Sequence, residues 1–255
     1  MFKPVSVELK SPRELAKLRD AGRLVSEVLE FLLERVAPGI TTKELDALAE
    51  RELRRARAEP AFLGYRGYPA VLCASVNDEV VHGIPSGSRV LKEGDIVSLD
   101  LGCRWKGFYG DAAVTAPVGA VSDEARRLMD VTRESLEKGI SSARPDNRLG
   151  DVSAAVQRHV EAAGFSAVRE FVGHGIGRAL HEDPAVPNVG QPGTGIRLRP
   201  GMVLALEPMV NAGGPDVRVL DDGWTAVTKD GSLSAHFEHM VAVTDGEPDI
   251  LTRRD

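Results

Sequence analysis

Residues 95–118, DIVSLDLGCRWKGFYGDAAVTAPV, contain two apolar runs on either side of the dipeptide Lys106-Gly107. A two-residue turn of this kind joins antiparallel strands, so the stretch predicts a hairpin. In that register Asp111 pairs with Gly102, and Asp100 projects from the same face. The hairpin therefore brings two carboxylates together as diagonal neighbours, within reach of one shared cation.

Two carboxylates on one buried strand face are costly unless something positive compensates their charges. A shared proton, a basic side chain or a metal ion would each supply that compensation. The alternative is that one aspartate belongs to a turn or a helix cap while the other lies solvated at a strand edge. The hairpin by itself leaves both interpretations open.

Amphipathic segments on both sides of the hairpin predict four helices. A capping box with proline at the first helical position begins the first helix after Ser11, and Pro38-Gly39 ends it. A second capping box at Thr41 begins the next helix. The other two helices cover residues 123–141 and 149–163, and strand-like runs cover residues 70–75, 95–103, 110–118, 202–208 and 239–243. Helices and strands mix without regular alternation, so the sequence predicts an α+β fold with antiparallel pairing, in one domain over residues 1–255.

The composition of the 255 residues narrows the range of functions. Lys and Arg total 32 against 38 Asp and Glu, a net charge of −6, and no long basic run occurs, which argues against nucleic acid as a specific ligand. No apolar run approaches the roughly 20 residues of a membrane-spanning helix, and the N-terminus lacks the features of a secretory signal. The two cysteines, Cys73 and Cys103, indicate neither a disulfide framework nor a zinc-thiolate site. The expected location is the cytoplasm, with no membrane partner.

Three further candidate ligands occur beside apolar runs or glycines. Glu207 ends the run MVLALE, Glu238 enters the run EHMVAV, and His174 lies in the glycine-rich stretch FVGHGIG. Four carboxylates and one imidazole make an oxygen-rich set that suits a pair of divalent ions such as Mn, Fe or Co, with Zn as a further candidate. Carboxylates that bridge two ions about 3.5–4 Å apart would activate a water molecule between them.

The residues in these contexts resemble the type I methionine aminopeptidases of the short bacterial kind over nearly the whole chain. That family binds metal through Asp, Asp, His, Glu and Glu, in this order. The matching segments are SLDLG (98–102), GD (110–111), GHGIG (173–177), LEP (206–208) and FEH (237–239). The resemblance implies a pita-bread fold, in which two pseudo-symmetric halves with flanking helices surround an antiparallel sheet. It also implies two divalent metal ions held by Asp100, Asp111, His174, Glu207 and Glu238.

The activity implied by the resemblance is removal of the N-terminal methionine from nascent proteins and peptides, through attack of a metal-activated water on the first peptide bond. His181 would donate a hydrogen bond to the scissile carbonyl. His82 would help to position the substrate amide and to protonate the leaving amine, and Glu207 would carry a proton as well as bind metal. An apolar pocket for the thioether side chain would be formed by Tyr65, Tyr68, Cys73 and Trp224, with Phe62 at its rim.

Two positions depart from the family pattern. Phe62 stands where a cysteine is often found, and Leu180 replaces a phenylalanine that is common just before the second histidine. We expect both differences to change the shape of the pocket rather than the reaction. Among the remaining histidines, His159 lies on the apolar face of a predicted helix and is expected to be structural, whereas His236 and His239 receive no assigned role.

A Xaa-Pro aminopeptidase-like peptidase and a non-catalytic peptide-binding protein on the same fold are the alternatives. Chains of the first class usually carry a large N-terminal domain, whereas only about 95 residues precede the first ligand strand here. A protein of the second class should have lost ligands, and this chain has all five. A dinucleotide-binding interpretation of residues 173–177 fails, because Arg178 takes the place of the third glycine. Expected partners are nascent chains, with transient association with the ribosome, and the expected state is a monomer.

Overall fold

The hairpin lies at the centre of the computed structural model, which describes residues 7–253. Strands β4 (Ile96–Trp105) and β5 (Phe108–Pro117) pair antiparallel along their whole length. Gly102 faces Asp111 in this ladder. The predicted register is therefore confirmed, and it fixes which face of the sheet carries the acidic side chains.

The hairpin turn has the backbone geometry that its two residues were expected to adopt. Trp105 and Phe108 form the last pair before the turn. Lys106 and Gly107 both have positive φ, 49° and 83°, as a two-residue I′ turn requires. The right-handed twist of such a turn matches the twist of the strands, and this match keeps the ten-residue strands in a single register.

Four antiparallel sheets are present in the part of the chain that the structure describes. In the first sheet, β4 of the hairpin also pairs with β1 (Glu59–Pro60) and β2 (Leu72–Val76). The second has the order β15-β14-β9-β7-β8, formed by Asp249–Ile250, His239–Ala242, Val203–Leu206, Gly173–Gly175 and Glu182–Val186. The third, β13-β10-β6, is formed by Ser234–His236, Met209–Asn211 and Ser166–Ala167. The fourth, β11-β12-β3, is formed by Val217–Val219, Ala226–Thr228 and Glu79–Val81.

The strand predicted over residues 202–208 is divided between two sheets. β9 ends at Leu206, and β10 begins at Met209 in a different sheet. Pro208 has no backbone N–H to contribute to a ladder, so the chain leaves the second sheet, which contains β9, before reaching it. Glu207 therefore lies in the break between two sheets rather than within a strand.

The four predicted helices are present, together with a short 3-10 turn. They are α1 (Pro12–Leu33), α2 (Thr42–Arg55), α3 (Asp123–Ser141) and α4 (Leu149–Ala162), and the turn is η1 (Tyr65–Gly67). The capping box of α1 forms as predicted, since the backbone N–H and Oγ of Ser11 both donate to the Glu14 carboxylate, at 2.9 and 2.7 Å. α1 ends at Leu33, before Pro38-Gly39, so the end of this helix was predicted too late in the sequence. In residues 7–253, each helix is too short or too polar to cross a membrane.

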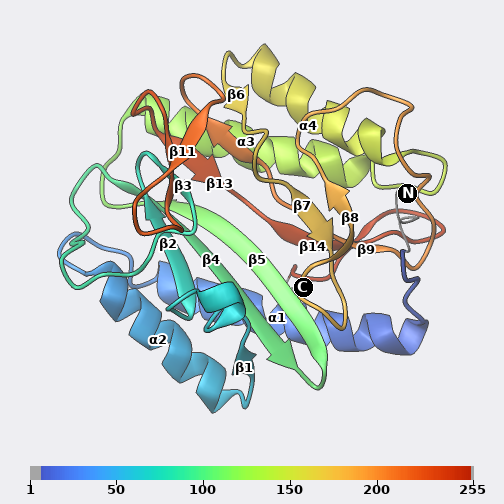
Figure 1. The fold of residues 1–255 in the computed structure, drawn as a ribbon, viewed down its shortest axis with the longest axis horizontal. Coiled ribbons are helices and arrows are strands. Elements are labelled where there is room, and N and C mark those ends of the chain that lie inside the picture. Colours follow the sequence, from blue (N-terminus) through green and yellow to red (C-terminus); the bar gives the residue numbers. More distant parts are fainter. Residues whose placement is uncertain (1–6, 254–255) are drawn as a thin grey trace.

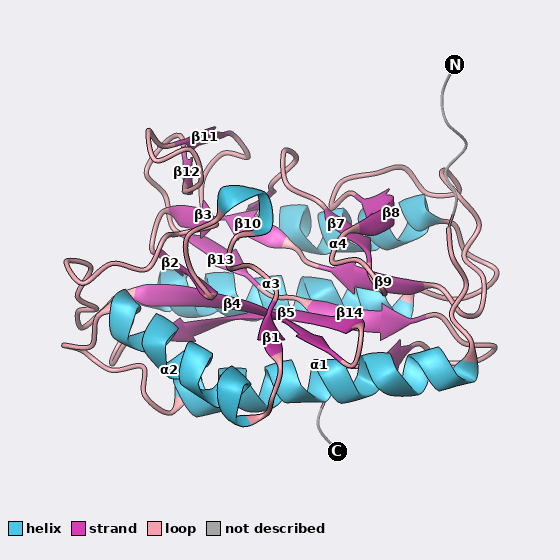
Figure 2. Cartoon of the chain, turned by 60° about the horizontal axis from the view of Figure 1, so that its bottom comes forward, coloured by secondary structure: helices cyan, strands magenta, loops and turns pink. Residues whose placement is uncertain are grey.

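The helices flank the strands in two groups. Figure 1 shows α1 and α2 along one side of the strands and α3 and α4 along the other. In the turned view of Figure 2, α1 and α2 run beneath β4 and β5. Each pair of helices packs mainly against the strands of its own half of the chain, which confirms the α+β prediction.

Apolar side chains fill the space between helices and strands. One buried cluster joins the first two helices to the first sheet and includes Val25 and Leu99. A second joins α3 and α4 to the second sheet and includes Leu136 and Leu204. Gly110 allows α1 to lie directly on β5, because a Cβ at this position would meet a carbonyl oxygen of the helix at 2.5 Å. This close contact fixes the strand that carries Asp111.

Candidate active site

A cavity of about 190 Å³ opens where the two halves of the fold meet. All twelve side chains that the sequence nominated line it. They are Phe62, Tyr65, Tyr68, Cys73, His82, Asp100, Asp111, His174, His181, Glu207, Trp224 and Glu238. Six further residues complete the lining: Arg66, Val81, Phe171, Val172, Leu180 and His236.

The five candidate metal ligands come from five separate places in the fold. Asp100 and Asp111 lie on the central hairpin, and His174 lies on β7. Glu207 occupies the break between β9 and β10, and Glu238 lies between β13 and β14. The acidic and imidazole side chains therefore converge only because strands of three sheets meet at this point.

The ligand atoms lie close enough together to hold metal. Potential ligand atoms of Asp111, His174 and Glu238 all lie within 4.8 Å of one another. The Nε2 atom of His174 is 3.8 Å from Oδ2 of Asp111 and 3.6 Å from Oε1 of Glu207. On the other edge of the ring, Nδ1 lies 2.9 Å from the carbonyl oxygen of Gly175 and donates to it, so Nε2 is left free to bind a cation.

Without a bound cation, the buried carboxyl groups of the cluster favour their protonated, neutral form. Burial raises the pKa of Asp100 to about 7. Burial, followed by the charges of the neighbouring carboxylates, raises the pKa values of Asp111, Glu207 and Glu238 well above their usual range. Burial lowers the pKa of His174 to about 4, so its imidazole is neutral at physiological pH, the form that binds metal.

Unsatisfied atoms provide an independent test of whether a cation fits here. Among the described residues, Asp100, Asp111 and Glu238 each have a buried carboxylate oxygen without a hydrogen-bond partner. Such atoms are costly in a protein interior, and a metal ion is one of the few groups that can satisfy several at once. Oxygen-rich donors with one imidazole also suit a divalent ion chemically. The residues present therefore fit a metal centre.

Two histidines without a predicted metal-binding role line other parts of the cavity. The His181 ring stacks on Tyr65 with centroids 5.2 Å apart, and its centroid lies 4.2 Å from that of His174. Burial and then the positive charge of Arg66 lower the pKa of His181. His82 contacts the ring of Phe171 edge to face at 5.4 Å, and burial lowers its pKa to about 4. Both imidazoles are therefore neutral near pH 7 and each has one N–H to donate.

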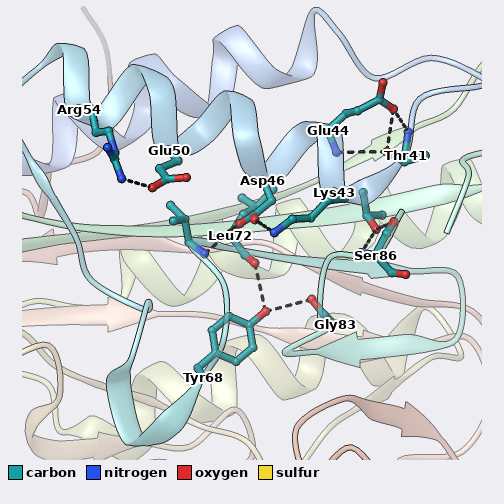
Figure 3. Close-up of polar contacts among 12 residues, drawn as sticks. Thr41, Lys43, Glu44, Asp46, Glu50, Arg54, Tyr68, Leu72, Gly83 and Ser86 are labelled. Carbon is teal, nitrogen blue, oxygen red and sulfur yellow. Dashed lines mark hydrogen bonds and ion pairs between the residues drawn. The ribbon is translucent and has the colours of Figure 1, made fainter. Parts of the chain in front are cut away.

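Aromatic side chains form a further part of the cavity wall. The rings of Tyr68 and Trp224 meet edge to face at 5.1 Å; Tyr68 forms a small buried cluster with Ala70 and Cys73, and Trp224 packs against this cluster. The Tyr68 hydroxyl lies 3.1 Å from the carbonyl oxygens of both Leu72 and Gly83, which fixes the position of the ring (Figure 3). A rigid, largely apolar wall of this kind suits an unbranched apolar side chain.

A carboxylate on α2 supports this wall from behind. Oδ1 of Asp46 accepts the backbone N–H groups of Val71 and Leu72, at 2.9 and 3.0 Å, and Oδ2 accepts Nζ of Lys43 at 2.7 Å. Figure 3 shows this buried side chain between the helix and the start of β2, which carries Cys73. Asp46 was not predicted from the sequence, because nothing about an acidic residue in a helix indicates a partner 25 positions later.

His236 is a site residue that the sequence did not assign. Its Nε2 atom lies 3.9 Å from Oε2 of Glu207 and has no hydrogen-bond partner among the described residues. The backbone of His236 is fixed through the hydroxyl of Thr115, which donates to its carbonyl and accepts its N–H. His239 instead points to Thr252, and His159 pairs with Glu134 on the surface, as expected for a structural residue. The only indication of this role in the sequence was the segment HFEH (236–239), in which two histidines flank the candidate ligand Glu238.

Comparisons with known proteins agree with this geometry. Residues 16–245 match Metallopeptidase family M24. Methionine aminopeptidase 1 of Bacillus subtilis is 54% identical over 244 residues, which are 96% of this chain and 98% of that protein. The crystal structure of methionine aminopeptidase from Thermotoga maritima is 49% identical, with a TM-score of 0.96 over 98% of this chain and 100% of that chain. The predicted pita-bread fold is confirmed.

Proline-specific enzymes share the fold at a greater distance. The prolidase from Pyrococcus horikoshii superposes with a TM-score of 0.78 at 21% identity, and the match covers 97% of this chain but only 64% of that one. At this level of identity the likeness concerns the fold alone.

Proposed function

This chain belongs to the methionine aminopeptidases of metallopeptidase family M24, and on that premise we propose that its cavity removes the N-terminal methionine from proteins and peptides. One observation supports the proposal most strongly. A cluster of buried acids and one imidazole lines the same cavity as a group of aromatic side chains with Cys73. Hydrolytic groups and an apolar side-chain pocket thus face the same small space.

The acid cluster would hold two divalent ions through Asp100, Asp111, His174, Glu207 and Glu238. Its unsatisfied carboxylate oxygens and neutral imidazole support this assignment. Four carboxylates with one nitrogen favour Mn, Fe or Co, with Zn as a further candidate. When bound, such ions supply Lewis acidity and lower the pKa of a water molecule, which makes it a nucleophile at neutral pH.

The apolar wall would select the first residue of the substrate. An unbranched thioether side chain fills irregular apolar space and makes favourable contacts with aromatic rings. Tyr65, Tyr68, Cys73 and Trp224 would bind it, with Phe62 at the rim. The small volume of the cavity supports cleavage after a single residue rather than within a chain.

The remaining polar side chains would handle the peptide bond and its protons. His181 would donate its N–H to the carbonyl oxygen as negative charge develops there. Loss of one such donor raises the activation free energy of other hydrolases by about 2.7–4 kcal/mol. His82 would position the substrate amide and assist protonation of the leaving amine. Glu207 would carry a proton as well as bind metal.

We further propose that residues 1–255 act as one catalytic domain, since residues from both halves of the chain line one cavity, and that this domain acts as a monomer. Substrates with an initiator methionine are newly made proteins, so the proposed setting is the cytoplasm, with transient association with the ribosome. The proline-specific and non-catalytic alternatives are not favoured, because the relative with 54% identity is a methionine aminopeptidase that this chain matches over nearly its full length.

The decisive experiment is peptide cleavage after the protein has been stripped with a chelator and supplied with Mn, Co, Fe or Zn. Met-Ala-Ser is the test substrate, Ala-Pro-Ser tests the proline-specific alternative, and N-acetylated Met-Ala-Ser is the control for a free amino terminus. We expect metal-dependent release of methionine from the first peptide alone. Cleavage of Ala-Pro-Ser alone would show that the enzyme is proline-specific. The absence of cleavage with every metal would favour the alternative of a non-catalytic peptide-binding protein.

A further inference from the structure

We propose that Lys10 and Glu182 form a buried ion pair whose role is to position His181 for catalysis. The inference rests on the proposed function, because it concerns the residue that would contact the substrate carbonyl. Neither Lys10 nor Glu182 lines the main cavity beside the acid cluster. Both are therefore positioning residues, which act on the reaction through the backbone of the loop that carries His181.

Lys10 is an unusually placed lysine. Its side chain is 1% exposed, and its Nζ atom lies 2.7 Å from Oε2 of Glu182 and 3.2 Å from Oε2 of Glu8. Its backbone N–H donates to the carbonyl oxygen of Gly201 at 2.7 Å, which fixes this segment to the C-terminal half of the chain. Lysine is rarely buried to this degree, and only when its charge is paired.

Glu182 uses its second carboxylate oxygen to hold the loop. Oε1 accepts the backbone N–H groups of Arg178 and Ala179, at 2.7 and 3.1 Å. The residue itself follows His181 directly and pairs with Gly175 where β8 begins beside β7. The carboxylate therefore accepts hydrogen bonds from the short connection between β7 and β8. Its three donors are the ammonium group of Lys10 and the backbone N–H groups of Arg178 and Ala179.

The ion pair packs tightly beneath Gly177. A Cβ at this position would lie 2.5 Å from Cε of Lys10 and 2.6 Å from Oε1 of Glu182, so a larger residue here would have to displace the ends of both side chains. The carbonyl oxygen of Gly177 accepts the N–H of Tyr109 at 2.9 Å, which ties the loop to the central hairpin. The loop is thus held from below by the ion pair and from the side by β5.

Arg178, in the same loop, has other partners for its side chain. The guanidinium of Arg178 donates to Glu14 at 2.9 Å and lies 4.7 Å above the ring of Phe108. Lys10 is therefore the cation that faces the Glu182 carboxylate in this loop. Without it, a half-buried carboxylate would draw in water or rotate to solvent, and the two backbone N–H groups would lose their acceptor.

Loss of the pair should disturb catalysis more than substrate binding. The ring of His181 is located by this loop and contacts the apolar wall at Tyr65, whereas Tyr68, Cys73 and Trp224 of that wall belong to other segments. Misplacement of a catalytic group by about 1 Å can cost roughly 100-fold in rate. We therefore expect kcat to fall while KM for Met-Ala-Ser stays within about threefold.

The test compares Lys10→Met, Lys10→Arg and Glu182→Gln with the wild-type enzyme, loaded with the metal that gives the highest activity. Glu182→Gln keeps an oxygen for the backbone N–H groups but removes the charge. Arg54→Met, which breaks an exposed ion pair with Glu50 on α2, is the matched control. We expect Lys10→Met and Glu182→Gln to lower kcat about 10- to 100-fold, Lys10→Arg to recover part of that loss, and the control to match the wild type.

A double-mutant comparison separates positioning from general damage. If Lys10 acts through His181, Lys10→Met should change kcat less than about twofold once His181 is already alanine. Hydrogen exchange of the metal-free protein gives a second readout, in which the amides of residues 176–182 should exchange at least about tenfold faster in Lys10→Met but not in Arg54→Met.

The proposal is overturned by wild-type kcat in a folded Lys10→Met protein, by an equal loss in the His181→Ala background, or by unchanged exchange of the loop. If Lys10→Met does not fold, Glu182→Gln provides the same comparisons. A wild-type enzyme that releases no methionine would contradict the proposed function instead, and the exchange measurement would still decide whether Lys10 orders the loop.

Discussion

The backbone N–H of Glu238 donates to the carbonyl oxygen of Ala113 at 2.9 Å. Ala113 lies in β5, on the same strand as Asp111, whereas Glu238 belongs to the C-terminal half of the chain. This one bond therefore fixes the separation of two candidate ligands that come from opposite halves of the fold. Metal binding and the association of the two halves should depend on each other, because the same contact serves both.

Removal of metal should make stability fall as pH rises above about 6.5. In the metal-free protein burial raises the pKa of Asp100 to about 7 and the pKa values of Asp111, Glu207 and Glu238 well above their usual range. The folded state then keeps protons that the unfolded chain has already released near pH 4. Each carboxyl that stays protonated in the folded state costs about 1.4 kcal/mol for every further pH unit.

Histidines act in the opposite direction at lower pH. Burial lowers the pKa of His174 to about 4. Below about pH 6.5 the imidazole is therefore protonated in the unfolded chain but not in the folded protein, and the folded state loses stability as the pH falls. The carboxyl effect is therefore measured cleanly between about pH 6.5 and 8.5, by chemical denaturation with and without metal. We expect the metal-free midpoint to fall across this range and the metal-loaded one to stay nearly level. A flat metal-free profile would contradict the idea that these carboxylates are protonated.

Replacing His174 by alanine should reduce metal binding and activity together. The imidazole supplies the one nitrogen ligand in the proposed set, and its Nε2 atom faces two of the acids. We expect metal affinity, measured by calorimetry with Mn or Co, to fall by a factor of about 100 or more, since even indirect supporting residues contribute 10- to 100-fold. His159→Ala is the matched control, because His159 only pairs with Glu134 on the surface. Equal affinity in the two variants would remove His174 from the site.

Asp46→Ala should destabilise the fold and loosen the substrate pocket. It would leave the buried backbone N–H groups of Val71 and Leu72 without their acceptor, at a cost of about 3 kcal/mol in the free energy of unfolding. Glu50→Ala on the same helix breaks only an exposed pair with Arg54 and should cost less than about 0.5 kcal/mol. Figure 3 shows both side chains.

Denaturant titration of the two variants gives the stabilities, and cleavage of Met-Ala-Ser gives KM. We expect KM to rise in Asp46→Ala because β2 carries Cys73, which lines the pocket. A KM equal to that of Glu50→Ala would show that the anchor serves stability alone.

Both thiols of the native protein should resist alkylation. Cys73 and Cys103 are 4% and 0% exposed, and burial raises the pKa of Cys103 to about 12 and that of Cys73 well above its usual range. The thiolate is the reactive form, so at pH 8 neither side chain should react with iodoacetamide within the time that labels an unfolded sample fully. Rapid labelling of Cys73 alone would mean that the cavity opens much more widely in solution.

The sequence by itself determined the features that depend on near neighbours. The two-residue turn fixed the register of the hairpin and hence the relation of Asp100 to Asp111, and the capping boxes fixed where α1 and α2 begin. Local segments around His174, Glu207 and Glu238 were distinctive enough to nominate ligands, since a charged group beside a buried run needs a reason to be there.

Only the tertiary structure decided how those pieces meet. Glu207 lies in a break between sheets because the chain changes partners before Pro208, and the distances within the acid cluster follow from the bond between Glu238 and Ala113. The supports of the site, Asp46 behind the pocket wall and Lys10 under the His181 loop, pair with residues 25 and 172 positions away. Contacts at such separations depend on the packing of whole helices and strands, so no local pattern of residues can encode them.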